Sequence, residues 1–339
     1  LDAFDHAVDV EVRDMVRDFA RTVVKPSARR YDLASEFPWD NVRQMADLGL
    51  LGIPWPEELG GAGMDYLSYI IVIEELARVD ASHAITVSAH TTLGTSPIMD
   101  FGTDEQKRRV VPLLASGRVL GGFGLTEPGA GSDAGGTKTV AVDQGDHYVL
   151  NGSKIFITHA GVGEIFVVTA RTDPRAGKTR GITSFVVTKD TTDLEEAKRV
   201  GVGHESTLAR TPGVAAAKKE DKLGWRASDT RELVFTDAVV PKENVLGPLG
   251  NGFRQMLHTL DGGRIGIGAL ALGIAAGALE ECLVYTGQRK QFGRPIASFQ
   301  GVHFALADMA TEIEAATPLV YPAAWLKQHG LPYKKEAAM

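Results

Sequence analysis

The sequence is poor in the residues that mark several large classes of protein. Among its 339 residues there is one cysteine, Cys282, which excludes an internal disulfide framework and fits a reducing compartment. Its nine histidines form no H-E-x-x-H pattern and no C-x-x-C occurs, so we expect no metal site. Acidic residues outnumber lysine and arginine by 43 to 36, and the net charge of −7 disfavours nucleic-acid binding, which requires a basic surface.

Long apolar runs are lacking as well, and the first residues given do not have the pattern of a leader. No stretch approaches the roughly twenty apolar residues of a membrane span, so we expect no membrane insertion. The first residues, LDAFDHAVDVEVRD, are acidic and periodic, unlike a signal or transit peptide. Because the chain starts without Met and stops within the helix-forming run YKKEAAM, we expect the natural protein to continue further.

A helical N-terminal domain is predicted over residues 1–118. Apolar residues recur at three- and four-residue steps from Phe4 to Val23, which predicts an amphipathic helix that ends near Pro26. Asp40 is expected to cap the next helix, because an aspartate accepts hydrogen bonds from the free backbone amides at a helix start.

The rest of this domain contains a loop and further helical stretches. The Pro- and Gly-rich residues 53–63 predict the loop. Residues 66–79 and 84–101 are apolar enough to form buried helices. Thr103 precedes a short helix in which acidic residues come first and basic residues later, as the helix dipole favours.

The pattern changes between residues 119 and 243. Short segments rich in β-branched and aromatic residues are separated by Gly, Asp, Asn and Pro, which is typical of an antiparallel barrel or sandwich. We predict a central antiparallel β-barrel domain here. One of its segments, 148–158, has the pattern of a strand, a turn and a second strand.

Helical patterns return over residues 244–339 and predict a C-terminal helical bundle whose last helices are missing. The first of its long helices is expected to break near Gly262–Gly263, because glycine disfavours a helix interior. The second is expected to kink or break near Pro318 and Pro322. The order of helical domain, β domain and helical domain predicts an α+β fold.

Two neighbouring segments, FGLTEPGAGSD (123–133) and YVLNGSKIFIT (148–158), predict a binding site. The first places a hydroxyl, an acid and small residues in a tight turn, and the second is expected to expose Phe156 and Thr158 at its end. Backbone amides in the turn suit phosphates, and the hydroxyls suit the edge of a flat ring. The alternative interpretation is structural: a plain β-turn, with Phe156 in the core and Thr158 as an ordinary strand residue.

The turn also contains Gly129–Ala134, which matches the relaxed G-x-G-x-x-A fingerprint of dinucleotide-binding domains. That fingerprint has to open a helix within a βαβ unit. The residues that follow it, GGTKTVAV, have a strand pattern instead, so we expect no Rossmann domain.

Taken together, the motifs resemble the acyl-CoA dehydrogenase family, and within it the short-chain, butyryl-type branch. The resemblance runs from near residue 5 to the last residue, with 190–213 as an excursion longer than the family's usual connection and without an assigned role. The stretches that carry it, in the family's order, are PEELGGAGMDYLSYIIVIEELARVD (56–80), LTEPGAGSDAGG (125–136), YVLNGSKIFIT (148–158), KKEDKLGWRASDTRELVF (218–235), TLDGGRIGIGALALGIA (259–275) and RKQFGRPIASFQGVHFALADM (289–309).

The resemblance implies an FAD-dependent acyl-CoA dehydrogenase for a short straight acyl chain. In that reaction a base removes the α proton of the thioester while a hydride leaves the β carbon for flavin N5, and electron-transferring flavoprotein then takes the electrons. The resemblance also implies a homo-oligomer, usually a tetramer, in the cytoplasm of a bacterium or archaeon or in the mitochondrial matrix of a eukaryote. An acyl-CoA oxidase, which passes electrons to oxygen, and a non-catalytic flavin-binding relative remain alternatives.

The same resemblance assigns residues to the FAD. The Thr126 hydroxyl would bond the ring, Phe156 would pack against it, Thr158 would donate near N5, and Ser132 would lie near the pyrophosphate and the CoA arm. Arg289 would reach the pyrophosphate of a neighbouring subunit with its planar pair of donors, unless it belongs to a solvated basic turn. The full predicted set is Phe123, Leu125, Thr126, Gly131, Ser132, Phe156, Ile157, Thr158, Arg289, Phe292, Phe299 and Gln300.

The resemblance also predicts the substrate contacts and the position of the base. For Asp261 and Arg264 the alternative is a surface ion pair at i, i+3 spacing, worth a few tenths of a kcal/mol. No residue matches either position of the family's catalytic glutamate, and Gly263 stands at one of them, so we expect the glutamate beyond Met339 and the chain as given to be inactive. The predicted acyl-CoA contacts are Ser132, Leu257, Leu260, Asp261 and Arg264.

Overall fold

The computed structural model describes residues 7–189 and 211–339, so most of the 190–213 excursion lies outside the described residues. The chain forms two units, each assembled from separate stretches of sequence. We call them the helical unit (Leu1–Arg29, Asp65–Ile85 and Arg264–Met339) and the sheet unit (Arg30–Met64 and Thr86–Gly263).

The first helix of the chain continues past its predicted end. α1 (Ala7–Phe19) passes through a π-helical turn, η1 (Ala20–Val24), directly into α2 (Lys25–Ala34). The predicted end at Pro26 is wrong: the helix continues past this residue, and the π-helical turn lies just before it.

The next helix, α3 (Trp39–Asp47), has Pro38 at its N-cap, whereas Asp40 lies within its first turn. The predicted cap is therefore wrong by two residues, although an acidic residue in a first turn is still favourable for the helix dipole. The predicted loop over 53–63 is confirmed, apart from one 3-10 turn, η2 (Glu57–Leu59).

The predicted apolar helices are confirmed. In α4 (Tyr66–Ala77) every residue is buried, and the Asp65 side chain caps it by accepting a hydrogen bond from the Ser68 amide at 2.7 Å. The helix predicted after Thr103 also forms, and a capping box of Thr103 and Gln106 starts it. The bounds of these later helices are α5 (Ala81–Ser88), the π-helical η3 (Ala89–Thr95), α6 (Ser96–Phe101) and α7 (Asp104–Ala115).

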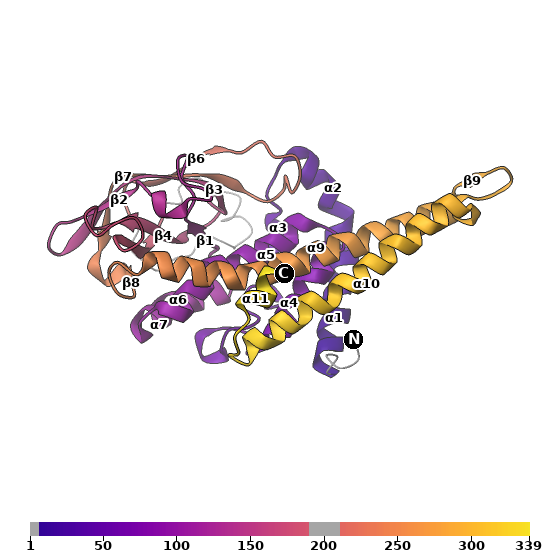
Figure 1. Cartoon of the computed structure of the whole chain (residues 1–339), viewed down its shortest axis with the longest axis horizontal. Helices are drawn as coiled ribbons and strands as arrows, with labels where there is room; N and C mark the ends of the chain where they lie inside the picture. The colour runs from indigo at the N-terminus through magenta and orange to yellow at the C-terminus, as the bar shows by residue number, and fades with distance from the viewer. Residues whose placement is uncertain (1–6, 190–210) are drawn as a thin grey trace. The chain divides into compact units, whose positions relative to one another are not determined.

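Two long helices follow the sheet and are shown in Figure 1. α9 (Gly252–Gln288) runs through Gly262–Gly263 without the predicted break, and α10 (Gln300–Gln328) runs through both of its prolines. Glycine and proline lower helix propensity, but helices in proteins are stabilised chiefly by packing, which here outweighs the local cost. The shorter elements around α10 are β9 (Lys290–Gln291), β10 (Arg294–Pro295), η6 (Ile296–Ser298) and α11 (Lys334–Ala338).

α9 also changes one expectation about membranes. Its most apolar 18-residue window has a mean hydropathy of 1.8 and is 28% buried, so α9 is long and apolar enough to cross a membrane by length and composition. Glycines and alanines are frequent along α9, so its sequence does not form a continuous run of large apolar residues. A core helix of a soluble protein passes the same test, so this one helix does not by itself assign a membrane span.

Within the helical unit, a buried ionic cluster joins α1 to α4. The Glu75 carboxylate, whose side chain is fully buried, accepts hydrogen bonds from Arg13 at 3.0 Å and from Arg17 at 2.9 and 3.0 Å. Burial by itself raises the Glu75 pKa, but its hydrogen bond from Arg17 and the surrounding arginine charges bring the net shift downward. Tyr321 of α10 donates to the neighbouring Glu74 and so ties α10 to the same cluster.

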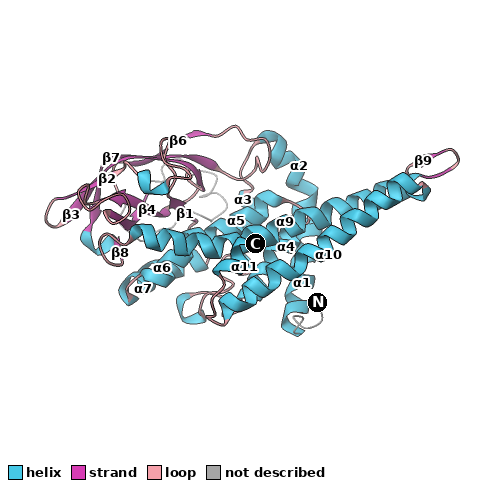
Figure 2. Cartoon of the chain, viewed as in Figure 1, coloured by secondary structure: helices cyan, strands magenta, loops and turns pink. Residues whose placement is uncertain are grey.

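The sheet unit contains one eight-stranded sheet in the order β6-β7-β3-β2-β4-β5-β8, with β1 paired to β4. Strands are magenta in Figure 2. Its strands are β1 (Gly121–Gly124), β2 (Val140–Asp143), β3 (His147–Thr158), β4 (Ile165–Arg171), β5 (Ile182–Thr188), β6 (Val214–Lys219), β7 (Thr230–Pro241) and β8 (Val245–Leu246). Short 3-10 turns lie at η4 (Ala134–Gly136) and η5 (Lys242–Asn244).

The predicted antiparallel barrel is wrong in two respects. The end strands β6 and β8 do not pair with each other among the described residues, so the sheet is not closed. β1 and β2 pair with β4 in parallel, so the sheet is mixed. The alternation of residues along a strand shows which face is buried but not which strand lies beside it, so closure could not be predicted from it.

Both faces of the central strand β4 are buried. Ile165 and Val167 pack with residues of α6 and α7 on one side. Phe166 and Val168 pack on the other side with inward residues of β3, β5 and β7. This double burial makes β4 a rigid support for β1, the strand that leads into the FGLTEPGAGSD segment.

Candidate functional site

β3 is one continuous strand, not the predicted strand, turn and strand, and a bulge near its end determines what it exposes. Lys154 pairs with Leu233 and Ile157 with Arg231, so β3 has one residue more than β7 between these pairs. The bulge places Phe156 at φ 58°, a left-handed conformation that costs an L-residue roughly 1–2 kcal/mol.

The bulge reverses the alternation of the side chains after it. Tyr148, Leu150 and Lys154 face inward, and without the extra residue Phe156 would continue that series into the core. Instead Ile157 is buried, and Phe156 is 61% exposed. The structural alternative that placed Phe156 in the core is therefore wrong.

The two segments singled out from the sequence lie against each other. The Ile155 amide donates a hydrogen bond to the Thr126 carbonyl at 2.8 Å. A Cβ atom added to Gly122 would lie 2.7 Å from the Thr158 carbonyl, so only glycine permits this approach of β1 to the end of β3. We call the resulting surface, formed by Phe123–Thr126, Gly131–Ser132 and Phe156–Thr158, the cofactor cradle.

The cradle offers donors and an aromatic face in an accessible position. Thr126 and Thr158 are half-buried, and no hydrogen bond to another described residue uses either hydroxyl. Gly131 and Ser132 are exposed, and no atom lies within 4 Å of where a Gly131 Cβ would be. Phe123 and Leu125 are half-buried, whereas the Ile157 side chain belongs to the core, so that only its backbone can face a ligand.

The turn between β1 and β2 is held by a buried ion pair. Glu127 and Ala130 exchange two backbone hydrogen bonds of 3.0 Å, and the Glu127 carboxylate accepts one from the Lys154 ammonium at 2.7 Å. The Lys154 side chain is fully buried and that of Glu127 nearly so. Although burial raises the Glu127 pKa, the Lys154 charge and the hydrogen bonds to the carboxylate bring that pKa down to about 2.

Two buried histidines hold the first residue of β1. His90 shares hydrogen bonds of 3.0 Å with the Gly121 amide and the Leu114 carbonyl. His159, the residue after Thr158, bonds the Gly121 carbonyl through Nδ1 at 2.8 Å. Burial lowers the pKa of both imidazoles, that of His90 to about 3, so both are neutral at physiological pH.

The predicted cross-subunit residues form a separate group in the helical unit, at the β9–β10 turn between α9 and α10. Phe292 is 92% exposed and stacks edge-on against Phe299, over whose ring the Arg294 guanidinium lies at 4.3 Å. Arg289 and Gln300 are exposed at the two helix ends that flank the turn. The structure thus brings these residues together with one another.

The predicted substrate residues other than Ser132 lie on α9. Leu257 is exposed, Leu260 and Asp261 are half-buried, and all three belong to the sheet unit. Arg264 lies three residues beyond Asp261 on the same helix, is exposed, and belongs to the helical unit. Beside Leu257, His258 lies 3.7 Å from the Asp100 carboxylate and packs against Phe101, an interaction that the sequence pattern did not indicate.

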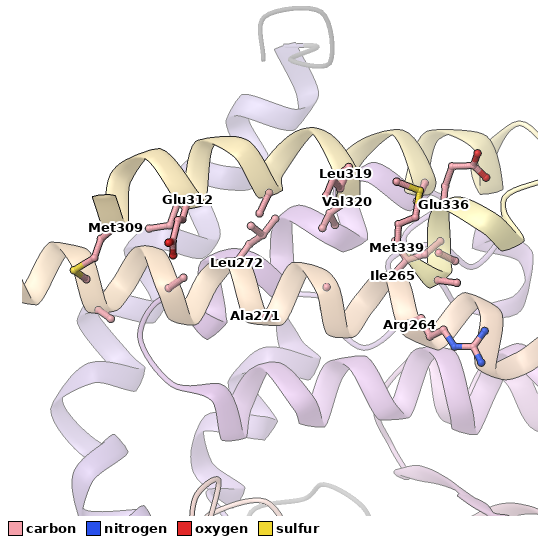
Figure 3. A pocket seen from close by; sticks show the side chains of 18 residues that line it. Arg264, Ile265, Ala271, Leu272, Met309, Glu312, Leu319, Val320, Glu336 and Met339 are labelled. Carbon is pink, nitrogen blue, oxygen red and sulfur yellow. The ribbon is translucent and has the colours of Figure 1, made fainter. Parts of the chain in front are cut away.

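The helical unit contains a cavity of about 640 Å³ between α9, α10 and the last residues of the chain (Figure 3). Ile265 and Leu272 on α9 and Ile313 and Val320 on α10 make its walls apolar. Of the predicted site residues, only Arg264 lines it. The cavity is therefore not the predicted cofactor site.

The cradle fits a planar cofactor with a phosphate tail. It combines an exposed phenyl face, two uncommitted hydroxyls and an open glycine turn, and the adjacent buried charges of Glu127 and Lys154 neutralise each other. Glu127, Lys154, His90 and His159 were not assigned roles from the sequence. One feature of the sequence could have indicated the ion pair: Lys154 falls at an inward-facing position in the alternation of β3. A lysine on a buried strand face requires a partner.

Comparison with known proteins identifies the relatives of this fold. Models of the acyl-CoA dehydrogenase N-terminal, middle and C-terminal domains match residues 8–118, 122–238 and 250–339. The chain is 50% identical over 327 residues to the short-chain specific acyl-CoA dehydrogenase of Clostridium acetobutylicum. The matched region covers 96% of this chain and 81% of that protein.

Solved structures agree with that similarity. Butyryl-CoA dehydrogenase from Megasphaera elsdenii superposes with a TM-score of 0.90 at 42% identity, covering 98% of this chain and 83% of that one. A chain from the structure described as electron transferring flavoprotein of Acidaminococcus fermentans gives 0.91 at 45% identity, covering 99% and 83%. An acyl-CoA dehydrogenase complexed with FAD, from Bacillus anthracis, gives 0.83 at 34% identity, covering 99% and 55%.

Proposed function

The chain belongs to the acyl-CoA dehydrogenase family, and we propose on that premise that it introduces an α,β double bond into short straight-chain acyl-CoA thioesters, with FAD as its cofactor. The observation that carries the proposal is the bulged end of β3. It presents Phe156 and Thr158 beside Thr126, in a chain similar to short-chain and butyryl-CoA dehydrogenases.

The cradle residues then have distinct roles. FAD, when bound, supplies the acceptor for the hydride that leaves the substrate β carbon. The Thr126 and Thr158 hydroxyls would donate to the polar edge of the ring, and the exposed Phe156 would cover its face and exclude water. The open turn at Gly131 and Ser132 leaves room for the phosphates and the CoA arm.

The proton-abstracting base is not Glu127, the carboxylate next to Thr126 in sequence. Its oxygens accept hydrogen bonds from Lys154, from the Thr137 hydroxyl and from the amides of Lys138 and Thr139. With its pKa lowered to about 2, this carboxylate stays charged and fully bonded at neutral pH. It therefore holds the turn in place and does not abstract a proton.

We propose that the FAD site is completed by a second copy of the chain in a homo-oligomer, as a tetramer. Arg289 and Gln300 are the proposed contacts to the partner's cofactor, and Phe292 supports this by exposing 92% of its surface at the β9–β10 turn. Nearby residues of α9 and α10 also expose large apolar side chains, which suits an oligomer interface. These residues are Leu283, Val284, Tyr285 and Phe304.

Electron-transferring flavoprotein is the proposed electron acceptor. The high similarity to a chain in the Acidaminococcus fermentans structure supports this choice over oxygen. The proposed location is the cytoplasm of a bacterium or archaeon, or the mitochondrial matrix of a eukaryote, in keeping with bacterial and mitochondrial relatives. Hydrogen peroxide produced at the rate of substrate oxidation would instead identify an acyl-CoA oxidase.

The test is anaerobic reduction of the flavin in the full-length protein. We expect butyryl-CoA to bleach the visible flavin absorbance faster than hexanoyl-CoA or octanoyl-CoA does. Bleaching by none of the three would contradict straight-chain dehydrogenation. Bleaching by octanoyl-CoA alone would contradict only the short-chain assignment.

A further inference from the structure

We propose that Lys154, held by Glu127, is a positioning residue that orients the Leu125–Thr126 peptide for FAD binding. The inference rests on the proposed function, because it concerns the cradle that FAD is proposed to occupy. No role for either side chain in cofactor binding was predicted from the sequence.

Lys154 makes an unusually complete set of contacts for a buried lysine. Its ammonium donates to the Glu127 carboxylate at 2.7 Å and to the Leu125 carbonyl at 3.1 Å. It also reaches the hydroxyls of Thr137 at 3.2 Å and Thr169 at 3.3 Å. Because an isolated buried charge is very costly, the ammonium stays in this position only while these acceptors surround it.

The bond to Leu125 determines the direction of the next amide. In a planar trans peptide the carbonyl and the N–H point to opposite sides. Since the Leu125 carbonyl points to Lys154, the Thr126 N–H points away from the buried ammonium. The Ile155 amide fixes the following carbonyl, that of Thr126, at 2.8 Å. Hydrogen bonds to Lys154 and Ile155 thereby orient both peptide groups that flank the Thr126 side chain.

Glu127 extends this control to the far end of the turn. Its carboxylate accepts hydrogen bonds from the Lys138 amide at 2.6 Å and the Thr139 amide at 3.0 Å. The ion pair therefore spans the loop that contains Gly131 and Ser132. A loop closed at both ends by one buried pair presents its backbone donors with little loss of conformational entropy on binding.

Three variants distinguish a role of the Lys154–Glu127 pair in positioning the FAD site from a role in stability alone. Lys154→Met leaves a buried carboxylate without its charge partner and should lower both thermal stability and FAD affinity. The double variant K154M/E127Q removes both charges, so the apoprotein should regain much of its melting temperature. Its FAD affinity should stay about tenfold or more below wild type, because the Leu125 carbonyl has lost a charge-assisted donor.

Glu127→Gln alone keeps the bond from Lys154 to Leu125. We expect it to lower the melting temperature and to weaken FAD binding less than the double variant does, because the Lys154 donor to Leu125 remains while the carboxylate that closes the loop is lost. Lys178→Met is the matched control. Lys178 forms an ion pair with Asp133, a residue of the same loop, but both side chains of this pair are exposed. It should change neither quantity.

The measurements are melting of the apoprotein and fluorescence titration with FAD at 10 °C, where folded protein is selected by size-exclusion chromatography. FAD affinity of K154M/E127Q within twofold of wild type would overturn the inference. So would a loss of affinity in E127Q as large as in the double variant, which would show that loop stability alone sets binding. If the wild-type protein itself binds no FAD, the proposed function and this inference are both wrong. If the flavin of the wild-type protein is bleached by butyryl-CoA and the double variant binds FAD as tightly as wild type, only the inference is wrong.

Discussion

The Gly121 amide donates a 3.0 Å hydrogen bond to Nδ1 of His90, which attaches the first residue of β1 to a fully buried imidazole. Nε2 of the same ring then carries the proton and donates to the Leu114 carbonyl at 3.0 Å. The bond therefore requires one neutral tautomer of His90. The start of β1 therefore depends on an imidazole whose pKa is lowered by burial to about 3, so that it stays neutral at physiological pH.

This dependence predicts how stability changes with pH. Burial lowers the His90 pKa to about 3 from an ordinary value of 6.5. Between these values the unfolded chain takes up a proton that the folded chain does not, so acidification through this window favours unfolding. We expect the wild-type melting temperature to fall from pH 7 to pH 5 and His90→Gln to show a shallower fall. Parallel curves for the two proteins would contradict this account.

A substitution of Phe156 should affect FAD binding much more than the stability of the fold. Phe156→Gly relieves the left-handed backbone cost of roughly 1–2 kcal/mol but adds about 0.5–1 kcal/mol of unfolded-state entropy, so melting should change by only a few degrees. FAD affinity should fall at least several-fold, because the aromatic face is lost. Leu223→Ala, at another exposed apolar side chain of the sheet unit, is the control and should leave FAD affinity unchanged.

The two cradle hydroxyls should behave alike in one assay and differently in another. Thr126→Val and Thr158→Val keep the side-chain shape and remove one hydrogen bond each, worth about 0.5–1.5 kcal/mol, or about 2- to 12-fold in FAD affinity. Thr158→Val should in addition slow flavin reduction by butyryl-CoA in FAD-saturated protein, since Thr158 is the proposed donor near N5. Thr236→Val, at an exposed position of β7, should match wild type in both titration and stopped-flow measurements.

Arg289 tests whether the site is shared between copies of the chain. Arg289→Gln should lower FAD retention during gel filtration, because a bidentate cation for the pyrophosphate is lost. Lys290→Gln removes the neighbouring exposed cation and should retain FAD normally. Equal retention by both variants would contradict the cross-subunit role.

Tyr321 provides a prediction for the helical unit alone. Tyr321→Phe removes the hydroxyl that donates to Glu74 and accepts from Arg13 at 3.0 Å, and leaves both charges with one partner fewer. We expect a loss of about 1–3 kcal/mol in the free energy of unfolding, measured with urea. FAD affinity per folded molecule should be unchanged, and a parallel loss of affinity would show that the two effects are not separate.

Helices and strands were predictable where local pattern alone decides them. The buried α4, the start of α7 after Thr103 and the β-branched strands β4 and β5 follow from periodicity and composition. The break expected at Gly262–Gly263 was wrong, and α10 does not break at Pro318 and Pro322, because packing outweighs a local propensity of a few kcal/mol. Sheet closure was wrong because strand order is not a local property.

The sequence by itself determined the family, the residue types of the cradle and the presence of a lysine and a glutamate within its two motifs. The tertiary structure decided where these side chains point. The parity of β3 depends on its register with β7, and one extra residue there turns Phe156 and Thr158 outward while Lys154 stays buried beneath Leu125. That arrangement arises from pairing between segments some eighty residues apart along the chain, so the pattern of neighbouring residues does not reveal it.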